Sequence, residues 1–119
     1  MELRPKTLIC DIDGTLVEHC RPDVAANPET KLKLLPGAMK KLLEWEHKGY
    51  RIILLTGRKE SMRNVTEKQL KEVGIFYDQL IMGVGGGTRH LINDTKPNGK
   101  ETAFAYNVPR DIGVKDLKL

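Results

Sequence analysis

TLICDIDGTL, residues 7–16, starts as a short apolar strand and ends in two carboxylates followed by a glycine. Successive side chains of a strand point to opposite sides, so Asp11 and Asp13 face the same way. Gly14 allows the chain to bend there because it has no Cβ that could clash. Two carboxylates on one side of the chain can share one metal ion. The stretch therefore predicts a site for phosphate chemistry at the end of a strand.

The length of the chain predicts a single domain. Its 119 residues suffice for one compact core and not for two, so we expect one domain over residues 1–119. The longest apolar run, residues 52–55, is far shorter than the roughly 20 residues of a membrane span, and the opening MELRPK lacks the apolar region of a signal peptide. We therefore expect a cytoplasmic protein that does not engage a membrane.

The net charge narrows the class of binding partner, and the cysteines indicate the redox compartment. The formal charge of +4 suits an anionic substrate, but Lys and Arg are scattered among acids and form no basic stripe with the few aromatic residues. A nucleic-acid surface is therefore not indicated. Cys10 and Cys20 do not make a disulfide framework, and both fit a reducing compartment. We expect Cys10 to be a small core residue and not a nucleophile.

Apolar strand-like runs alternate with helical patterns along the chain. The expected strands are residues 8–10, 52–55, 79–82 and 90–92, the expected helices are about 36–48 and 59–73, and a last edge strand is expected at 102–106. This alternation predicts a parallel α/β sheet.

Three polar segments fall at the ends of different predicted strands: Asp11, Thr56, and the pair Asn93 and Asp94. Ligands of open parallel sheets bind beyond the carboxyl ends of the strands, so the three segments are expected to converge. Taken singly, each has an ordinary structural explanation, such as Thr56 capping the second helix or Asn93 and Asp94 forming a turn. Their joint position at one edge favours a shared site.

The motifs resemble those of the haloacid dehalogenase superfamily. DIDGT (residues 11–15) is similar to its first motif, IILLTGR (52–58) to its second, and LIND (91–94) to its fourth, in the family's order. The resemblance implies a phosphatase in which Asp11 is the nucleophile. It also implies that Asp13 protonates the leaving oxygen and then deprotonates water. The three motifs together cover nearly the whole chain.

Two further sets of residues follow from this chemistry. Thr56 is a candidate catalytic residue whose hydroxyl would hold the phosphoryl oxygens with the amides of Gly57 and Arg58, at the positive end of the second helix. Mg²⁺ prefers oxygen ligands and keeps several waters, so we expect it between the carboxylates of Asp11 and Asp94 and the backbone carbonyl of Asp13. Asn93, next to Asp94, would contact the metal through water.

The family's third motif, a Lys that offsets charge at the phosphoryl group, is absent from its expected place. A glycine-rich stretch, residues 83–87, stands there and is interpreted as a flexible turn at the mouth of the site, because it lacks the spacing of a phosphate loop. Lys96 is the favoured substitute, as a catalytic and phosphate-binding residue, and Arg89 is the alternative.

The resemblance implies a Rossmann-like three-layer sandwich with a mainly parallel central sheet and no cap domain, because residues 14–35 and 74–79 are short connections. An uncapped site admits large substrates unless a second copy of the chain covers it. The resemblance to small capless members of the superfamily implies a phosphorylated small molecule as substrate, with a sugar phosphate as first choice. Two alternatives stay open: a phosphatase acting on nucleic-acid 3′ ends, and a non-catalytic binding or regulatory module of the same fold.

Overall fold

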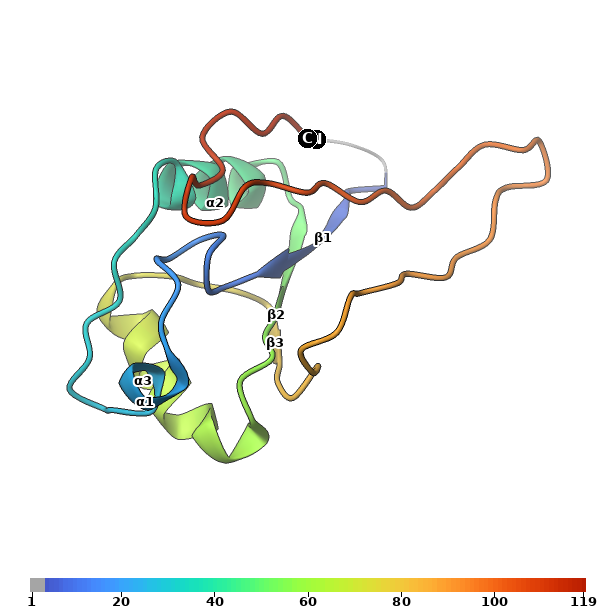
Figure 1. Ribbon diagram of the computed structural model, residues 1–119. Helices are drawn as coiled ribbons and strands as arrows, with labels where there is room; N and C mark the ends of the chain where they lie inside the picture. Colours follow the sequence, from blue (N-terminus) through green and yellow to red (C-terminus); the bar gives the residue numbers. More distant parts are fainter. Residues whose placement is uncertain (1–3) are drawn as a thin grey trace.

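The computed structural model describes residues 4–119, and its helices and strands follow the predicted alternation (Figure 1). In chain order they are β1 (Thr7–Asp11), α1 (Pro22–Ala25), α2 (Ala38–His47), β2 (Arg51–Leu55), the 3₁₀ turn η1 (Glu60–Met62), α3 (Arg63–Glu72) and β3 (Gln79–Ile81). The first three predicted strands and both predicted helices are confirmed. The short helix α1 lies in a stretch that was expected to be a loop.

The three strands form a parallel sheet in the order β1-β2-β3. Leu8 of β1 lies opposite Ile52 of β2, and Leu54 of β2 lies opposite Leu80 of β3. Because every strand runs in the same direction, the carboxyl ends of all three meet at one edge of the sheet. Asp11 ends β1 and Thr56 directly follows β2, so the structure brings these two predicted site residues to that edge.

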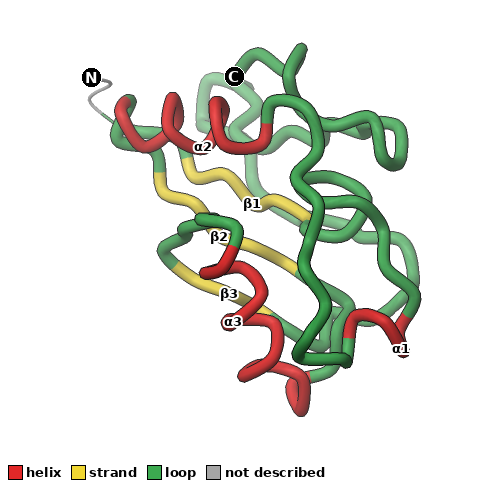
Figure 2. The backbone as a smooth tube through the Cα atoms, turned by 90° about the vertical axis from the view of Figure 1, so that its left-hand side faces the viewer, coloured by secondary structure: helices red, strands yellow, loops and turns green. Residues whose placement is uncertain are grey.

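The core lies between the sheet and its helices. Leu42 and Trp45 of α2 and Leu70 of α3 are buried against Ile52 and Leu54 of β2. Figure 2 shows α2 and α3 in front of the strands, on the same face. The parallel, Rossmann-like fold is confirmed, and the described residues supply two of the three expected layers, one of strands and one of helices.

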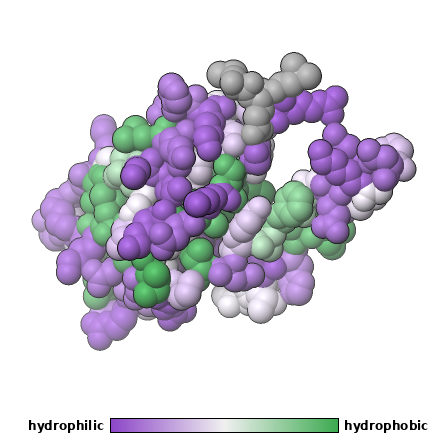
Figure 3. All heavy atoms as spheres, turned by 90° about the horizontal axis from the view of Figure 1, so that it is seen from above, coloured by the Kyte–Doolittle hydropathy of each residue, from purple (hydrophilic) through white to green (hydrophobic). Residues whose placement is uncertain are grey.

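The predicted strands at 90–92 and 102–106 do not form in the described part of the chain. The segment between β3 and the C-terminal residues instead runs out from the sheet (Figure 1). Its tip forms a separate, mostly hydrophilic lobe in Figure 3. Leu91 and Ile92 are 62% and 93% exposed. An extended segment gains stability only when its backbone groups pair with a neighbouring strand and its apolar side chains are covered. Neither occurs here, so these two predictions were wrong.

Candidate active site

Asp11 and Asp13 lie on either side of Ile12, where a tight turn begins at the carboxyl end of β1. Ile12 between them is fully buried, and its carbonyl oxygen accepts the backbone N–H groups of residues 15–17 at 2.9–3.2 Å. Gly14 adopts a left-handed φ of 86°, a conformation that favours glycine. The core therefore fixes Ile12. The side chains of Asp11 and Asp13 remain 36% and 17% exposed, so both are accessible to solvent.

Thr56 lies in a second turn, which follows β2. Its side chain is buried, and its hydroxyl oxygen accepts the backbone N–H of Arg58 at 3.1 Å. The adjoining Gly57 approaches the glycine-rich stretch so closely that a Cβ on it would lie 3.2 Å from the carbonyl oxygen of Gly85. The predicted flexible turn therefore lies against Thr56 and Gly57 at the carboxyl edge of the sheet.

The helix that follows Thr56 begins too late to place the backbone amides of Gly57 and Arg58 at its positive end. The 3₁₀ turn starts at Glu60 with Lys59 as its N-cap residue, and α3 starts at Arg63. The predictions that Thr56 caps the second helix and that the amides of Gly57 and Arg58 lie at its N-terminus were therefore wrong. The hydroxyl of Thr56 already binds within its own turn, so its contact with a phosphoryl oxygen stays a prediction.

The side chain of Arg58 binds Asp13 through two parallel hydrogen bonds. Its Nε lies 2.9 Å from Oδ2 and its Nη2 lies 2.8 Å from Oδ1. The remaining terminal nitrogen, Nη1, donates to Thr66 Oγ1 at 3.2 Å and to Gln69 Oε1 at 2.7 Å. Paired hydrogen bonds between a guanidinium and a carboxylate fix geometry as well as charge. Arg58 therefore orients the Asp13 carboxylate, a role that the sequence analysis missed.

Helix α3 holds Arg58 in place, and residues 25–27 in turn hold Gln69 of that helix. Thr66 and Gln69 are buried on one face of α3, three residues apart, and the Gln69 amide donates to the carbonyl oxygens of Ala25 and Asn27 at 3.1 Å each. In the described residues no buried side-chain nitrogen or oxygen lacks a hydrogen-bond partner. Polar residues at an i, i+3 spacing on the inner face of a predicted helix were the available signal for a buried partner.

Arg89 is the cation that the structure places at Asp11. Its Nη1 lies 3.0 Å from Asp11 Oδ1, while the Thr15 hydroxyl donates to Asp11 Oδ2 at 3.3 Å. Arg89 follows the glycine-rich stretch, which leads from β3 back to the end of β1. The alternative considered for the absent third-motif lysine therefore lies next to the predicted nucleophile.

Lys96 and Asp94 lie elsewhere, in the segment after β3 that runs out from the sheet, which we call the projecting segment. Both are exposed. The backbone of Lys96 closes a turn by donating its N–H to the carbonyl oxygen of Lys100 at 2.9 Å, and the Asp94 carbonyl accepts the Thr102 hydroxyl at 2.9 Å. Asn93 donates to Thr102 Oγ1 at 2.8 Å. Since the strand at 90–92 does not form, no sheet register carries these residues to Asp11.

The described residues contain no cluster of three or more His, Cys, Asp or Glu side chains able to hold a metal ion. The predicted set of Asp11, Asp13 and Asp94 is thus not assembled. Two oxygen donors of the kind that Mg²⁺ prefers are nevertheless at hand: the Asp11 carboxylate and the carbonyl oxygen of Asp13, which accepts no backbone hydrogen bond from residues 4–119. The donor set fits magnesium in kind, with two protein ligands in place of three.

The cysteines do not resemble nucleophiles. Burial, followed by the charge of Asp11, raises the pKa of Cys10 to about 12. Burial and then the charge of Asp13 raise the pKa of Cys20 above its ordinary value. A thiolate is the reactive form, so both thiols are disfavoured as nucleophiles. Cys10 packs against the hydrophobic core as predicted.

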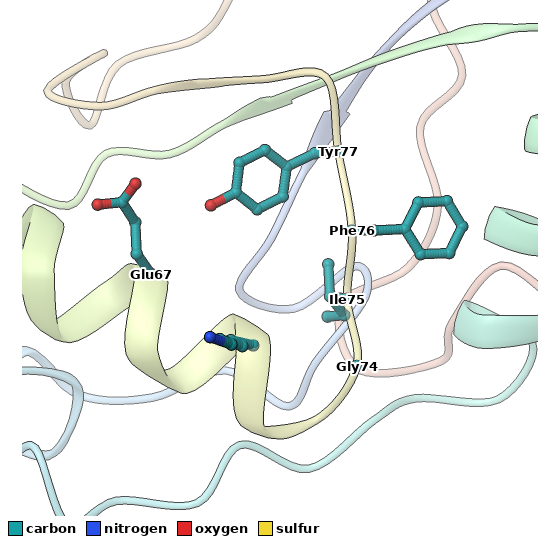
Figure 4. A pocket seen from close by; sticks show the side chains of 6 residues that line it. Glu67, Gly74, Ile75, Phe76 and Tyr77 are labelled. Atoms are coloured by element: carbon teal, nitrogen blue, oxygen red, sulfur yellow. The ribbon is translucent and has the colours of Figure 1, made fainter.

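A surface depression of about 460 Å³ lies at the opposite edge of the sheet (Figure 4). It is lined by Glu67 and Lys71 of α3 and by residues 74–77, which lead into the amino end of β3. Its two charged side chains do not form a pair of nucleophile and base. It is therefore not the candidate active site.

Comparison with known families decides where the chain belongs. Residues 8–112 match the family described as PITM 1-3, LNS2 domain. The chain belongs to the LNS2 family. The LNS2 domain has the fold of haloacid dehalogenase phosphatases, so the resemblance of the three motifs to that superfamily is confirmed. No curated protein matches this LNS2 domain.

Solved structures with a similar fold include chains of a repair complex. A chain of the Pnkp1/Rnl/Hen1 complex is 31% identical over 72% of this LNS2 domain, with a TM-score of 0.57. A chain of the Pnkp1/Rnl/Hen1 RNA repair complex is 33% identical over 66% of it, with a TM-score of 0.55. The domain spans 30% and 25% of the length of those two chains.

A third similar structure shares the fold at lower identity. It is the D,D-heptose 1.7-bisphosphate phosphatase of B. bronchiseptica complexed with magnesium and phosphate, 18% identical over 68% of this LNS2 domain and 51% of its own chain, with a TM-score of 0.52. The helices of the LNS2 domain are short. Among residues 4–119, no helix is long and apolar enough to cross a membrane.

Proposed function

We propose that the chain is a single-domain, magnesium-dependent phosphatase that hydrolyses phosphate monoesters through an aspartyl phosphate on Asp11. The observation that carries this proposal is the arrangement at the end of β1. Asp11 is partly exposed there, contacts the guanidinium of Arg89, and lies two residues before an acid that Arg58 orients. A nucleophile, a cation and a second carboxylate are the groups that phosphoryl transfer through a covalent intermediate requires.

The reaction takes two steps. In the first, an Asp11 oxygen bonds to phosphorus, the ester oxygen leaves, and Asp13 gives that oxygen a proton. In the second, Asp13 takes a proton from water, the water oxygen bonds to phosphorus, and Asp11 leaves as a free carboxylate. Arg89 offsets charge on the phosphoryl group and the nucleophile. Bound magnesium, held by the Asp11 carboxylate and the Asp13 carbonyl, would neutralise further phosphoryl charge.

Asp94 remains a predicted third ligand of the metal, and Lys96 a predicted phosphate-binding residue. Both roles require the projecting segment to lie against β1. The proposal does not depend on either, because Mg²⁺ keeps several waters and is often bound by one or two carboxylates.

The site is open, which leaves room for substrates of different sizes. Residues 14–35 contain only the four-residue helix α1, which leaves Asp11 and Asp13 without a cap domain among the described residues. A sugar phosphate, which the resemblance to small capless phosphatases of the superfamily supports, is the first choice, and a second copy of the chain could cover the open site. The second candidate, a phosphatase of nucleic-acid 3′ ends, is favoured by the likeness to two chains of an RNA repair complex at 31% and 33% identity.

The test is phosphate release from p-nitrophenyl phosphate, a panel of sugar phosphates and a 3′-phosphorylated oligonucleotide, with magnesium or with chelator. Wild type, Asp11→Asn and the control Asp23→Asn are compared, since Asp23 is an exposed acid paired only with Arg21 in the described chain. We expect metal-dependent turnover that only Asp11→Asn abolishes, and hydroxylamine-labile phosphate on acid-quenched wild type. Phosphate binding without turnover in any arm would instead indicate a binding module.

A further inference from the structure

Residues 109–113, near the C-terminal end of the chain, lie against the turn that carries the two catalytic carboxylates. The backbone N–H of Asp111 donates to the carbonyl oxygen of Gly14 at 2.8 Å. The Asp111 side chain accepts the backbone N–H of His19 at 2.8 Å. In Figure 1 this red segment passes beside the blue loop that follows β1. Two hydrogen bonds between parts of the chain more than 90 residues apart therefore fix its position over the site.

The conformation of Asp111 indicates that this position is specified. Its φ is 63°, and it is the one residue other than glycine with a positive φ in the part of the chain that the structure describes. Left-handed conformations of such residues cost energy and persist where the surroundings enforce them. Three residues further on, Val114 is buried and donates its N–H to Pro36 at 3.0 Å. The segment is thus anchored at both Asp111 and Val114.

Arg110 lies between these anchors and the catalytic turn. A Cβ on Gly14 would lie 3.2 Å from Arg110 Cγ and 3.9 Å from its Nε, so the side chain lies directly on that glycine. Arg110 is exposed, and its guanidinium has neither a hydrogen bond nor an ion pair with residues 4–119. An anchored backbone therefore presents an unpaired cation against Gly14, the residue that follows Asp13, whereas Arg58 and Arg89 are both committed to carboxylates.

We infer that Arg110 binds a second phosphate group of the substrate, carried by the leaving group. The inference rests on the proposed function, in which Asp13 protonates the leaving oxygen, because Gly14 directly follows Asp13 and places Arg110 on the leaving-group side. A guanidinium matches phosphate geometry through paired hydrogen bonds and holds its charge at all working pH values. The preferred substrate is therefore a bisphosphate or a phosphate monoester with a neighbouring phosphodiester.

The experiment measures kcat/KM for thymidine 3′,5′-bisphosphate relative to thymidine 3′-monophosphate, which differ only in the second phosphate. We expect wild type to prefer the bisphosphate, and Arg110→Ala to lower that preference about tenfold, the effect of losing one charge-assisted hydrogen bond. Arg110→Lys should retain part of it. The control, Lys118→Ala, removes the same charge from an exposed position closer to the C-terminus, outside residues 109–113, and should leave the ratio unchanged. Equal ratios in Arg110→Ala and wild type would overturn the inference.

Two further arms separate the source of the phosphate and the failure of the proposed function. A 3′-phosphorylated trinucleotide that depends on Arg110 more than the bisphosphate does would assign the second phosphate to a nucleic-acid end, and the reverse would assign it to a small molecule. If wild type releases no phosphate at all, the proposed function fails. Calorimetry of Asp11→Asn then decides the inference: tighter binding of the bisphosphate that Arg110→Ala removes supports it, and equal binding of both nucleotides overturns it.

Discussion

Arg58 and Asp13 form a two-pronged ion pair, with nitrogen-to-oxygen distances of 2.9 and 2.8 Å, between the turns that follow β2 and β1. The Arg58 side chain is 5% exposed, and the Asp13 side chain is 17% exposed. The pair joins the two halves of the candidate site to the buried face of α3. Its geometry therefore makes both stability and the direction of the Asp13 carboxylate depend on Arg58.

Replacing Arg58 should destabilise the fold. Arg58→Met keeps the apolar stem but leaves the Asp13 carboxylate and the buried side chains of Thr66 and Gln69 without their partner. We expect the free energy of unfolding to fall by about 3 kcal/mol, as for other buried pairs that lose one member. Urea denaturation measures this.

The control for this variant is Arg21→Met, which removes a surface pair whose side chains are 77% and 72% exposed and should change stability little. Adding Asp13→Asn to Arg58→Met should recover part of the loss, because it removes the uncompensated charge. A double variant that is less stable by the sum of both single losses would contradict the coupling.

Arg89 should matter more for turnover than Lys96. Arg89→Ala removes the cation 3.0 Å from Asp11, and we expect kcat for p-nitrophenyl phosphate to fall about a hundredfold, a typical effect of losing one group that stabilises transition-state charge. Lys96→Ala should cause a smaller loss. Lys100→Ala, an exposed position in the same projecting segment, is the control. A larger loss in Lys96→Ala than in Arg89→Ala would show that the projecting segment docks during the reaction.

The sequence predicted those elements whose pattern is local. β1 and β2 are apolar runs with a polar residue at or directly after their ends, and β3 is a short apolar run that leads into a glycine-rich stretch. α2 and α3 carry apolar side chains at helical spacing. The strand at 90–92 failed because a short apolar run becomes a strand only beside a partner, and the structure leaves Ile92 93% exposed. A short apolar run cannot reveal whether a partner strand is present.

In the candidate site, too, the sequence predicted what a local pattern specifies and missed the contacts between distant residues. The positions of Asp11 and Thr56 at the carboxyl edge follow from the strand pattern and the parallel sheet. The contact of Arg58 with Asp13 does not, because it joins residues 45 positions apart. The same is true of Arg89 and Asp11, which are 78 positions apart. The direction of a long side chain is set by its tertiary neighbours.

Alkaline pH should destabilise the chain through Cys10. Its pKa is raised from an ordinary value of 9.0 to about 12 in the folded chain, so the folded state retains a proton that the unfolded state loses first. The resulting stability is fully present below pH 9 and is lost as the pH rises toward 12. With chelator present, the melting temperature of wild type should fall over this range more than that of Cys10→Ala. Parallel curves for the two proteins would contradict the assignment.

Two glycines hold the C-terminal segment, and with it Arg110, against α2. A Cβ on Gly37 would lie 2.3 Å from the Cα of Lys115, and one on Gly113 would lie 2.5 Å from the carbonyl oxygen of Pro36. Both glycines also have positive φ values, 85° and 95°. Gly37→Ala must therefore move backbone, and we expect it to lower the free energy of unfolding by about 1–3 kcal/mol.

The matched control is Gly87→Ala, because a Cβ there would meet nothing within 4 Å. It should leave stability nearly unchanged. Since displacing Lys115 loosens the segment that carries Arg110, Gly37→Ala should also raise KM for thymidine 3′,5′-bisphosphate more than KM for thymidine 3′-monophosphate. If Gly37→Ala proves as stable as Gly87→Ala, the segment does not pack against α2 in solution. The support for the position of Arg110 would then be lost.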